Sequence, residues 1–452
     1  MKRILTFAII IASTYTAYSQ SLGYNDLGIL FSKDDNYGTA RFEGMSGAFG
    51  ALGGDISAFG INPAGSAVAI KSTFGVTLGN RNTTYTTNYY GNTTETEDDF
   101  FNITQAGGIL SFDSALNSDW NRFALTFNYR LKSDFDGFYS SQGNSGFLFY
   151  PEHFADESAT PTQFDRSIDQ FISRETFGQS SVFNIGFSAV YQNKLFVGGS
   201  LKFHSLEFNQ YSYLNEINDD VDGNILDTED IENIYYDGSG FSLSLGFIYK
   251  LNQNIRLGLA YETPTWYQEV FEDFSYSLDM APIEDLNISN YYEELNHELF
   301  TYKFKSPSRV TASGAYVFGK LGLISVDYTY KDYKNIRFNS NGFENENRSF
   351  ANDYRNTHSL NIGTEWRFDD FSIRGGYHYE KNPNLLAALG GDTNKDNLRG
   401  FSLGLGYKFG NTKFDLAYQN SESINYNSSY NLGDIPTTNN TSRISGTITF
   451  SL

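Results

Sequence analysis

The chain has 452 residues, and its 53 acidic and 32 basic residues give a formal net charge of −21, which argues against nucleic acid as a partner because phosphate binding needs a basic face. The absence of cysteine excludes disulfide scaffolds, thiolate metal sites and cysteine nucleophiles. Aromatic residues make up 17% of the chain and proline is scarce, which suits a protein with many strands and few breaks.

Residues 1–19 have the pattern of a secretory signal peptide. Lys2 and Arg3 precede an apolar run from Ile4 to Ala12, and Ala17-Tyr18-Ser19 has the small-residue spacing of a cleavage site. We expect cleavage after Ser19, and a short buried helix is the alternative. Beyond Ala12 no apolar run approaches the roughly 18 residues that a membrane helix needs.

Residues 20–72 are rich in small residues and lack the alternation found later in the chain. They include the run from Gly44 to Asp55 and the triplet Asn62-Pro63-Ala64. Small residues let two backbones approach closely, which predicts a compact plug inside a larger structure. A glycine-rich phosphate loop is the alternative for Gly44 to Gly54, but no βαβ unit surrounds it.

Residues 73–452 alternate between apolar and polar side chains, as strands with two different faces do. In the last such segment, Ile444, Ile448 and Phe450 alternate with small polar residues. The predicted strands lie near 73–87, 101–112, 121–133, 181–191, 194–209, 235–251, 254–262, 300–318, 320–334, 354–368, 370–380, 397–409, 411–421 and 440–452. This even count of about fourteen is typical of an outer-membrane barrel, and we expect Phe123, Phe241, Phe401 and Phe450 to face lipid.

The connections between these strands support the same architecture. Tight turns are predicted at Gln192-Asn193, Leu251 to Asn254, Phe318 to Lys320, Phe368 to Asp370 and Gly410-Asn411. The segments 134–180, 210–234 and 263–299 are predicted to be long acidic loops. Short turns at one end and long loops at the other favour an outer-membrane barrel over the alternative, a soluble β-sandwich.

The run Gly44-Met45-Ser46-Gly47-Ala48-Phe49-Gly50, followed by Asp55 and by Asn62-Pro63-Ala64, resembles the N-terminal hatch of the FadL family. Members of that family are bacterial outer-membrane transporters for long-chain fatty acids and, in some cases, aromatic hydrocarbons. The resemblance implies an all-β fold, a roughly 14-stranded antiparallel transmembrane β-barrel over 73–452 with the 20–72 hatch in its lumen. It also implies that Asn62, Pro63 and Ala64 form the hatch motif.

The resemblance has a consequence for the exit route. In the family, ligand is thought to leave sideways into the membrane through a gap at a kinked strand. The third predicted strand, Arg122 to Leu131, contains neither Gly nor Pro. Gly107-Gly108 in the second strand is therefore the candidate for a bulge that opens the wall.

The alternation directs many charged side chains into the lumen, because charge on the lipid face is costly. This inward set is Arg130, Lys132, Lys202, His204, Arg256, Arg309, Asp327, Glu365, Arg367, Arg374 and Glu380. Arg130, Arg256 and Arg374 are candidates for binding a ligand carboxylate, since guanidinium presents a two-pronged donor. The alternative is a salt-bridge network that holds the plug.

Two of the predicted loops carry apolar side chains at helical spacing. Thr160 to Gln163 has a capping-box pattern, and the apolar positions after it are Phe164, Ile168, Phe171 and Ile172. Trp266, Tyr267 and Phe271 repeat the pattern in a second loop. We predict an apolar groove at the barrel mouth; the alternative is that each stripe packs on its own loop or on the plug.

One acidic segment nearly fits a twelve-residue calcium loop. Asn218, Asp220, Asp222 and Glu229 fall at ligand positions, with Gly223 at the sharp turn. Asp392, Asn394 and Asp396 form a weaker second copy. The alternative is a solvated acidic loop, and no other cofactor is predicted.

No enzymatic motif is evident, since the sequence has no HExxH and no G-x-S-x-G nucleophile elbow at a strand-to-helix turn. We therefore interpret the chain as an outer-membrane channel for passive uptake of hydrophobic small molecules, gated by its hatch. The expected partners are that ligand, outer-membrane lipid and the barrel-assembly machinery. The alternative function is that of a protein-binding barrel in a bacterial secretion system.

Overall fold

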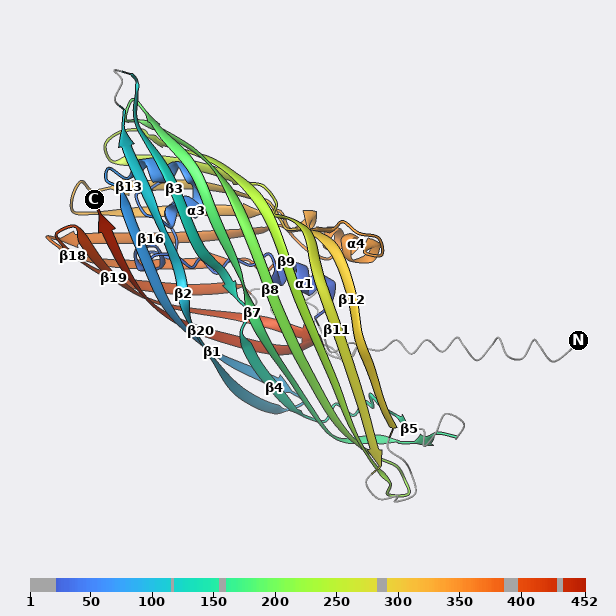
Figure 1. Cartoon of the computed structure of the whole chain (residues 1–452). Helices are drawn as coiled ribbons and strands as arrows, with labels where there is room; N and C mark the ends of the chain where they lie inside the picture. Colours follow the sequence, from blue (N-terminus) through green and yellow to red (C-terminus); the bar gives the residue numbers. More distant parts are fainter. Residues whose placement is uncertain (1–21, 115–117, 154–159, 283–290, 386–396, 429–433) are drawn as a thin grey trace, which may run out of the picture.

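The computed structural model describes residues 22–114, 118–153, 160–282, 291–385, 397–428 and 434–452. Over these residues, 14 antiparallel spans form a closed barrel around an N-terminal plug (Figure 1). The first strand, β1 (Thr73–Tyr89), closes the barrel by pairing with the last, β20 (Asp434–Ser451), from Thr73↔Ser451 to Thr87↔Thr437. The predicted fold class and strand count are therefore confirmed.

Most spans are single strands. These are β1, β2 (Asn92–Asp113), β3 (Trp120–Asp134), β7 (Arg166–Tyr191), β8 (Leu195–Asp219), β9 (Ile225–Lys250), β16 (Thr357–Phe368), β17 (Phe371–Glu380), β18 (Leu398–Phe409), β19 (Thr412–Ser428) and β20. Three adjacent spans are interrupted and consist of β10 (Ile255–Glu262) with β11 (Trp266–Pro282), β13 (Arg309–Val317) with β12 (Tyr291–Lys305), and β14 (Gly322–Lys331) with β15 (Arg337–Phe338). Three further short strands are β4 (Gly137–Gly143), β5 (Glu152–His153) and β6 (Thr162–Gln163).

Proline accounts for two of the interruptions. Pro264 and Pro307 lie between the paired halves of neighbouring spans, where a residue without N–H cannot continue the ladder. The residues at the two breaks are joined by a backbone hydrogen bond, in which the Ser306 N–H donates to the Thr265 carbonyl oxygen at 3.0 Å. The wall consequently stays closed across the break.

The inside and outside faces are assigned as the alternation predicts. Phe241, Phe401 and Phe450 are exposed on the outer surface, and Phe123 is half-exposed and stacked on exposed Phe187. Most of the predicted inward charged residues are buried. The outer surface is thus an apolar belt and the lumen is polar.

The predicted inward charged residues differ in how far they are buried. The buried members of the predicted inward set are Arg130, Lys132, Lys202, His204, Asp327, Glu365 and Arg374. Arg256, Arg309 and Glu380 are half-buried. Arg367 differs from the prediction, because its side chain is 41% exposed.

The two ends of the barrel differ in their connections. One end carries the predicted tight turns, including Gln192-Asn193 and Asp369 at positive φ, and is called the short-turn end. The other, the long-hairpin end, is where β7, β8, β9, β11 and β12 extend past the other strands (Figure 1). Much of the segments predicted as loops is therefore strand. No helix among the described residues is long and apolar enough to cross a membrane.

The plug runs from the long-hairpin end to the short-turn end, where it joins β1. It contains α1 (Tyr24–Leu30), α2 (Ala40–Glu43), α3 (Ala58–Ile61) and the 3₁₀ helix η1 (Pro63–Val68). Outside the plug, η2 (Tyr333–Asn335) and α4 (Glu344–Asn352) lie between β14 and β16. The Asn25 amide donates to the Glu346 carbonyl at 3.0 Å, which joins α1 to α4.

Candidate ligand pathway

Wall glycines let the backbone of the plug touch the inner wall. A Cβ added to Gly258 on β10 would lie 2.5 Å from the Gly50 carbonyl oxygen, and one added to Gly363 on β16 would lie 2.5 Å from that of Met45. The wall glycines in such contacts are Gly198, Gly258, Gly363, Gly376 and Gly404, and Gly246 lies in the same way against the Asn62 side chain. No side chain fits between wall and plug at these positions, so residues 44–64 fill the lumen tightly. This packed layer of the plug is called the floor.

The hatch motif is part of this contact. The Asn62 side-chain amide donates to the Gly50 carbonyl at 2.8 Å and to the Phe247 carbonyl of β9 at 3.0 Å, and its oxygen accepts from the Ala64 amide at 3.1 Å. Pro63 occupies the first turn of η1, where its missing N–H costs nothing. Asn62 therefore fixes the plug turn and ties it to the wall.

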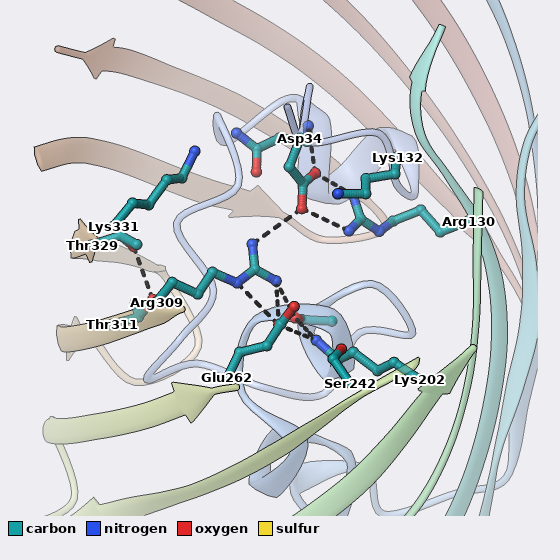
Figure 2. A network of polar contacts seen from close by, with 12 residues as sticks. Asp34, Arg130, Lys132, Lys202, Ser242, Glu262, Arg309, Thr311, Thr329 and Lys331 are labelled. Carbon is teal, nitrogen blue, oxygen red and sulfur yellow. Dashed lines mark hydrogen bonds and ion pairs between the residues drawn. The ribbon is translucent and has the colours of Figure 1, made fainter. Parts of the chain in front are cut away.

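A buried polar network joins the plug to the wall above this floor (Figure 2). Arg130 contacts both carboxylate oxygens of Asp34, at 2.6 and 2.9 Å, and Arg309 reaches the same carboxylate at 3.1 Å. Arg309 also contacts Glu262 at 2.7 Å, and Lys202 pairs with Glu262 from the other side. Plug residue Asp34 is thus held by wall arginines from two directions.

The pKa of the Asp34 carboxyl is lowered by its partners. Burial alone would raise its pKa, but the charge and hydrogen bonds of Arg130, with the charges of Arg309 and Lys132, hold the pKa well below 3.8. A depressed carboxyl pKa means that the ion pair stabilises the fold above the unfolded pKa of 3.8 and that this stability is lost as the pH falls below it.

We expect Asp34→Asn to lower the thermal unfolding midpoint of the purified protein by a few degrees at neutral pH, because it leaves buried Arg130 without its carboxylate partner. The difference from the unmodified chain should persist down to about pH 4 and shrink in stronger acid. Circular dichroism melts across this range measure it. A difference that does not change with pH would contradict this origin.

The three candidate carboxylate-binding arginines all have internal partners. Arg130 holds Asp34, and Arg256 donates to the Leu52 carbonyl of the plug at 2.9 Å. Arg374 contacts Glu365 at 2.7 Å, and Glu365 also contacts Arg41 of the plug at 2.7 Å. This arrangement is that of the alternative, a network that holds the plug.

The upper lumen has one aromatic and one polar side. Leu27 and Phe31 of the plug are buried among wall rings that include Phe208, Tyr236 and Phe304. Beside α1 lie two lumenal cavities of about 270 and 250 Å³, which share Ile29, Lys33 and Tyr85 among their lining residues. The larger one is lined on its far side by polar residues of β17 to β20, such as His378, Ser421 and Arg443.

The wall has a seam at which two neighbouring spans are not joined by backbone. Pairing of β2 with β3 ends at Gln105↔Arg130, although β2 continues to Asn92 and remains paired with β1. Leu131, Lys132 and Ser133 of β3 are buried, and the register of β3 with β7 shifts between Leu131 and Ser133. The third span therefore turns inward there.

Side chains bridge this seam. The Asn102 amide donates to the Gln179 side-chain oxygen at 3.2 Å, and the Asn92 amide donates to the Gln142 carbonyl at 3.0 Å. Exposed Phe101 and Ile103 lie beside the end of the seam that is nearest Gln105. The predicted bulge at Gly107-Gly108 is not where the irregularity lies: the β1–β2 register shifts at Thr77/Leu78, opposite Gln105 and Ile103.

The predicted helical stripes are wrong in secondary structure, because both segments lie largely in strands. The predicted groove residues also separate: Phe164 packs with Leu226, Ile172 packs with Leu214, and Tyr267 packs near Phe304. Ile168 is exposed, and Phe171, Trp266 and Phe271 are half-buried. The described residues form no single groove from the two stripes.

The predicted calcium ligands are not brought together. Asp220 accepts hydrogen bonds from the Asp222 and Asn224 amides within its own turn, whereas Glu229 lies along β9 and accepts from Tyr213. The Asn218 amide donates to the Tyr150 carbonyl at 2.9 Å. Across the described residues no cluster of three or more His, Asp or Glu side chains suits a metal ion. The weaker copy at Asp392, Asn394 and Asp396 lies outside the described residues.

Sequence reasoning did not single out several residues that organise the lumen. Asp34 stands in the charged run Lys33-Asp34-Asp35, which gives no sign of burial. Glu262 ends a predicted strand, Asn102 looks like an ordinary polar strand residue, and Gln179 falls in a segment predicted to be a loop. Their importance depends on contacts between distant segments, for which a single sequence carries no signal.

The sequence matches no protein-family model and no curated protein. Among solved structures, a Pseudomonas aeruginosa FadL homologue is 14% identical, with 91% of this chain and 98% of that chain covered and a TM-score of 0.60. The P. putida toluene transporter TodX is 16% identical, with 92% and 99% covered and a TM-score of 0.54. The Ralstonia pickettii toluene transporter TbuX is 16% identical, with 90% and 98% covered and a TM-score of 0.50. At these identities the likeness concerns the fold, and the chain shares the plugged 14-stranded barrel fold of these FadL-type proteins.

Proposed function

We propose that the protein is a channel of the bacterial outer membrane through which hydrophobic small molecules diffuse inward. The fold is similar to that of two toluene transporters and a FadL homologue. The belt of exposed apolar side chains around the barrel suits contact with lipid. The long-hairpin end faces outward in this arrangement, and the short-turn end faces the periplasm.

The observation that carries the proposal is the contrast between the floor and the seam. Backbone contacts at Gly258 and Gly363 pack the plug against the wall near the short-turn end. The seam above Gln105 lacks backbone hydrogen bonds between β2 and the third span, and apolar Phe101 and Ile103 lie beside it. A hydrophobic molecule in the lumen therefore leaves sideways into the membrane, where its transfer free energy is favourable.

The hatch gates this passage in the proposed mechanism. Asn62 is buried and makes three hydrogen bonds, one of them to the wall. Each is worth about 1 kcal/mol, so the loss of all three raises the population of a loosened plug by up to about a hundredfold. The barrel persists without them, because its strands hold its backbone hydrogen bonds.

We expect Asn62→Ala to change the uptake of toluene or a long-chain fatty acid several-fold, with unchanged surface level and heat-modifiable migration on gels. Pro63→Gly should act in the same direction, since Gly restores conformational freedom and a donor to the turn. Ser66→Ala is the matched control: its hydroxyl is buried in the same plug and has no hydrogen-bond partner in the described residues. Equal uptake in all variants would show that the plug is only structural.

A deletion strain distinguishes the channel from the secretion-system alternative. Loss of hydrophobic uptake with an unchanged set of secreted proteins supports the channel. Loss of secreted proteins with unchanged uptake would support the alternative and overturn the proposal.

A further inference from the structure

The first helix of the plug fills an aromatic chamber in the upper lumen. The Phe31 ring lies 5.7 Å from Tyr236, 5.9 Å from Phe208 and 6.3 Å from Phe304, measured between ring centroids. These are the separations at which aromatic rings attract one another edge to face. The wall thus offers a ready-made pocket for one aromatic ring, and the chain's own Phe31 occupies it.

Tyr24, at the start of the same helix, occupies a second position of this kind. Its ring lies 4.8 Å from Phe343 and 5.8 Å from both Tyr302 and Phe338. Its hydroxyl contacts both oxygens of the Glu272 carboxylate, at 3.0 and 3.1 Å. Glu272 is a buried residue of β11. It accepts this hydrogen bond from the phenol group of Tyr24 in a region lined mainly by aromatic rings.

The contacts that keep α1 in place differ from those that keep residues 44–64 in place. The floor around residues 44–64 is locked by backbone contacts with wall glycines, whereas Leu27 and Phe31 pack among rings. The 250 Å³ cavity, lined by Leu22, Asp26 and Leu30, lies along α1 and gives it room to shift. Gly23, before α1, supplies no side-chain cap.

We propose that the chamber filled by α1 is a ligand site, and that it takes an aromatic ring bearing a neutral hydrogen-bond donor, as in a phenol. This inference rests on the proposed channel function and names its substrate class. The ligand replaces Tyr24 by packing edge to face among the same rings and by donating a hydrogen bond from its hydroxyl to Glu272. α1 acts as a competing internal ligand that leaves the chamber when the external one binds.

Glu272 determines the selectivity in this scheme. A hydrogen bond to a charged acceptor adds roughly tenfold or more in affinity over an arene that has no donor. A carboxylate ligand would place a second negative charge beside Glu272 in a buried site and is disfavoured. The preferred order is therefore phenol, then arene, then aryl carboxylate.

Three probes that differ in one substituent test this order: p-cresol, toluene and p-toluate. Calorimetry on the full-length protein in lipid nanodiscs should give p-cresol roughly tenfold tighter binding than toluene, with p-toluate weakest. Glu272→Gln should reduce the preference for p-cresol several-fold and relieve the exclusion of p-toluate. Glu269→Gln, an exposed position on the same strand, is the matched control and should match the unmodified chain.

Tyr24→Phe provides a second test that does not alter the wall. It removes the hydrogen bond between α1 and Glu272, so p-cresol and toluene should both bind more tightly. Equal affinities for p-cresol and toluene, or no response to either substitution in correctly folded protein, overturn the inference. Uptake of toluene with no preference for p-cresol leaves the channel standing, whereas uptake of none of the three, nor of a fatty acid, also removes the proposed function.

Discussion

A disulfide across the seam should stop the uptake of hydrophobic ligands while leaving the barrel intact. The side chains of Asn102 and Gln179 meet at 3.2 Å where β2 faces β7 without backbone pairing. In the double variant Asn102→Cys with Gln179→Cys, oxidation replaces a breakable side-chain contact with a covalent bond. The chain has no native cysteine, so the new pair has no competing thiol.

We expect oxidation to lower uptake by at least about tenfold and a reductant to restore it, if passage through the seam is required. The control is Thr311→Cys with Thr329→Cys, whose hydroxyls lie 2.9 Å apart on the paired strands β13 and β14. Strands β13 and β14 are already joined by backbone hydrogen bonds, so a disulfide between them should not change uptake. Unchanged uptake in the oxidised Asn102–Gln179 variant would rule out the lateral route at this seam.

The sequence predicts the barrel well because each strand face has a single environment. The period of two is strong where an apolar belt opposes a polar lumen, as at Phe241 and Phe450. It fades where β8 extends beyond that belt: Gln210, Ser212 and Glu216 point inward and are buried, but their polarity conceals the alternation. The sequence pattern therefore predicts loops where these extensions lie.

The prediction of helical spacing around Tyr267 is wrong for a different reason. Tyr267 and Val270 are three residues apart and both buried, as they would be on one face of a helix. The strand achieves the same spacing through a bulge, since the register of β11 with β9 shifts between Tyr267 and Glu269. A spacing of three is thus ambiguous between a helix and a bulged strand.

The candidate site was predictable in its parts but not in its pairings. Alternation places Arg130 and Arg374 in the lumen, and the hatch motif identifies Asn62. Nothing in the sequence pairs Arg130 with Asp34, which is 96 residues away along the chain. The seam is equally hidden, because the third span turns inward without a Gly or Pro at the turn.

Substitution of a wall glycine should displace the plug and open the barrel to polar solutes. A Cβ on Gly258 would lie 2.5 Å from the Gly50 carbonyl oxygen and 3.2 Å from the Ala51 Cα, both of them backbone atoms that cannot rotate away. In Gly258→Val the plug must therefore shift, at a cost of about 1–3 kcal/mol or more for overpacking. The strand itself should tolerate valine, which favours β structure.

We expect Gly258→Val to raise the single-channel conductance in planar bilayers and the sensitivity of cells to a large hydrophilic antibiotic. Gly314→Val is the matched control: Gly314 lies on the neighbouring strand, and an added Cβ there meets nothing within 4 Å. Its conductance and sensitivity should equal those of the unmodified chain. A closed, non-conducting Gly258→Val barrel at normal surface levels would mean that the plug yields without opening the floor, and passage would then depend on the seam and α1 alone.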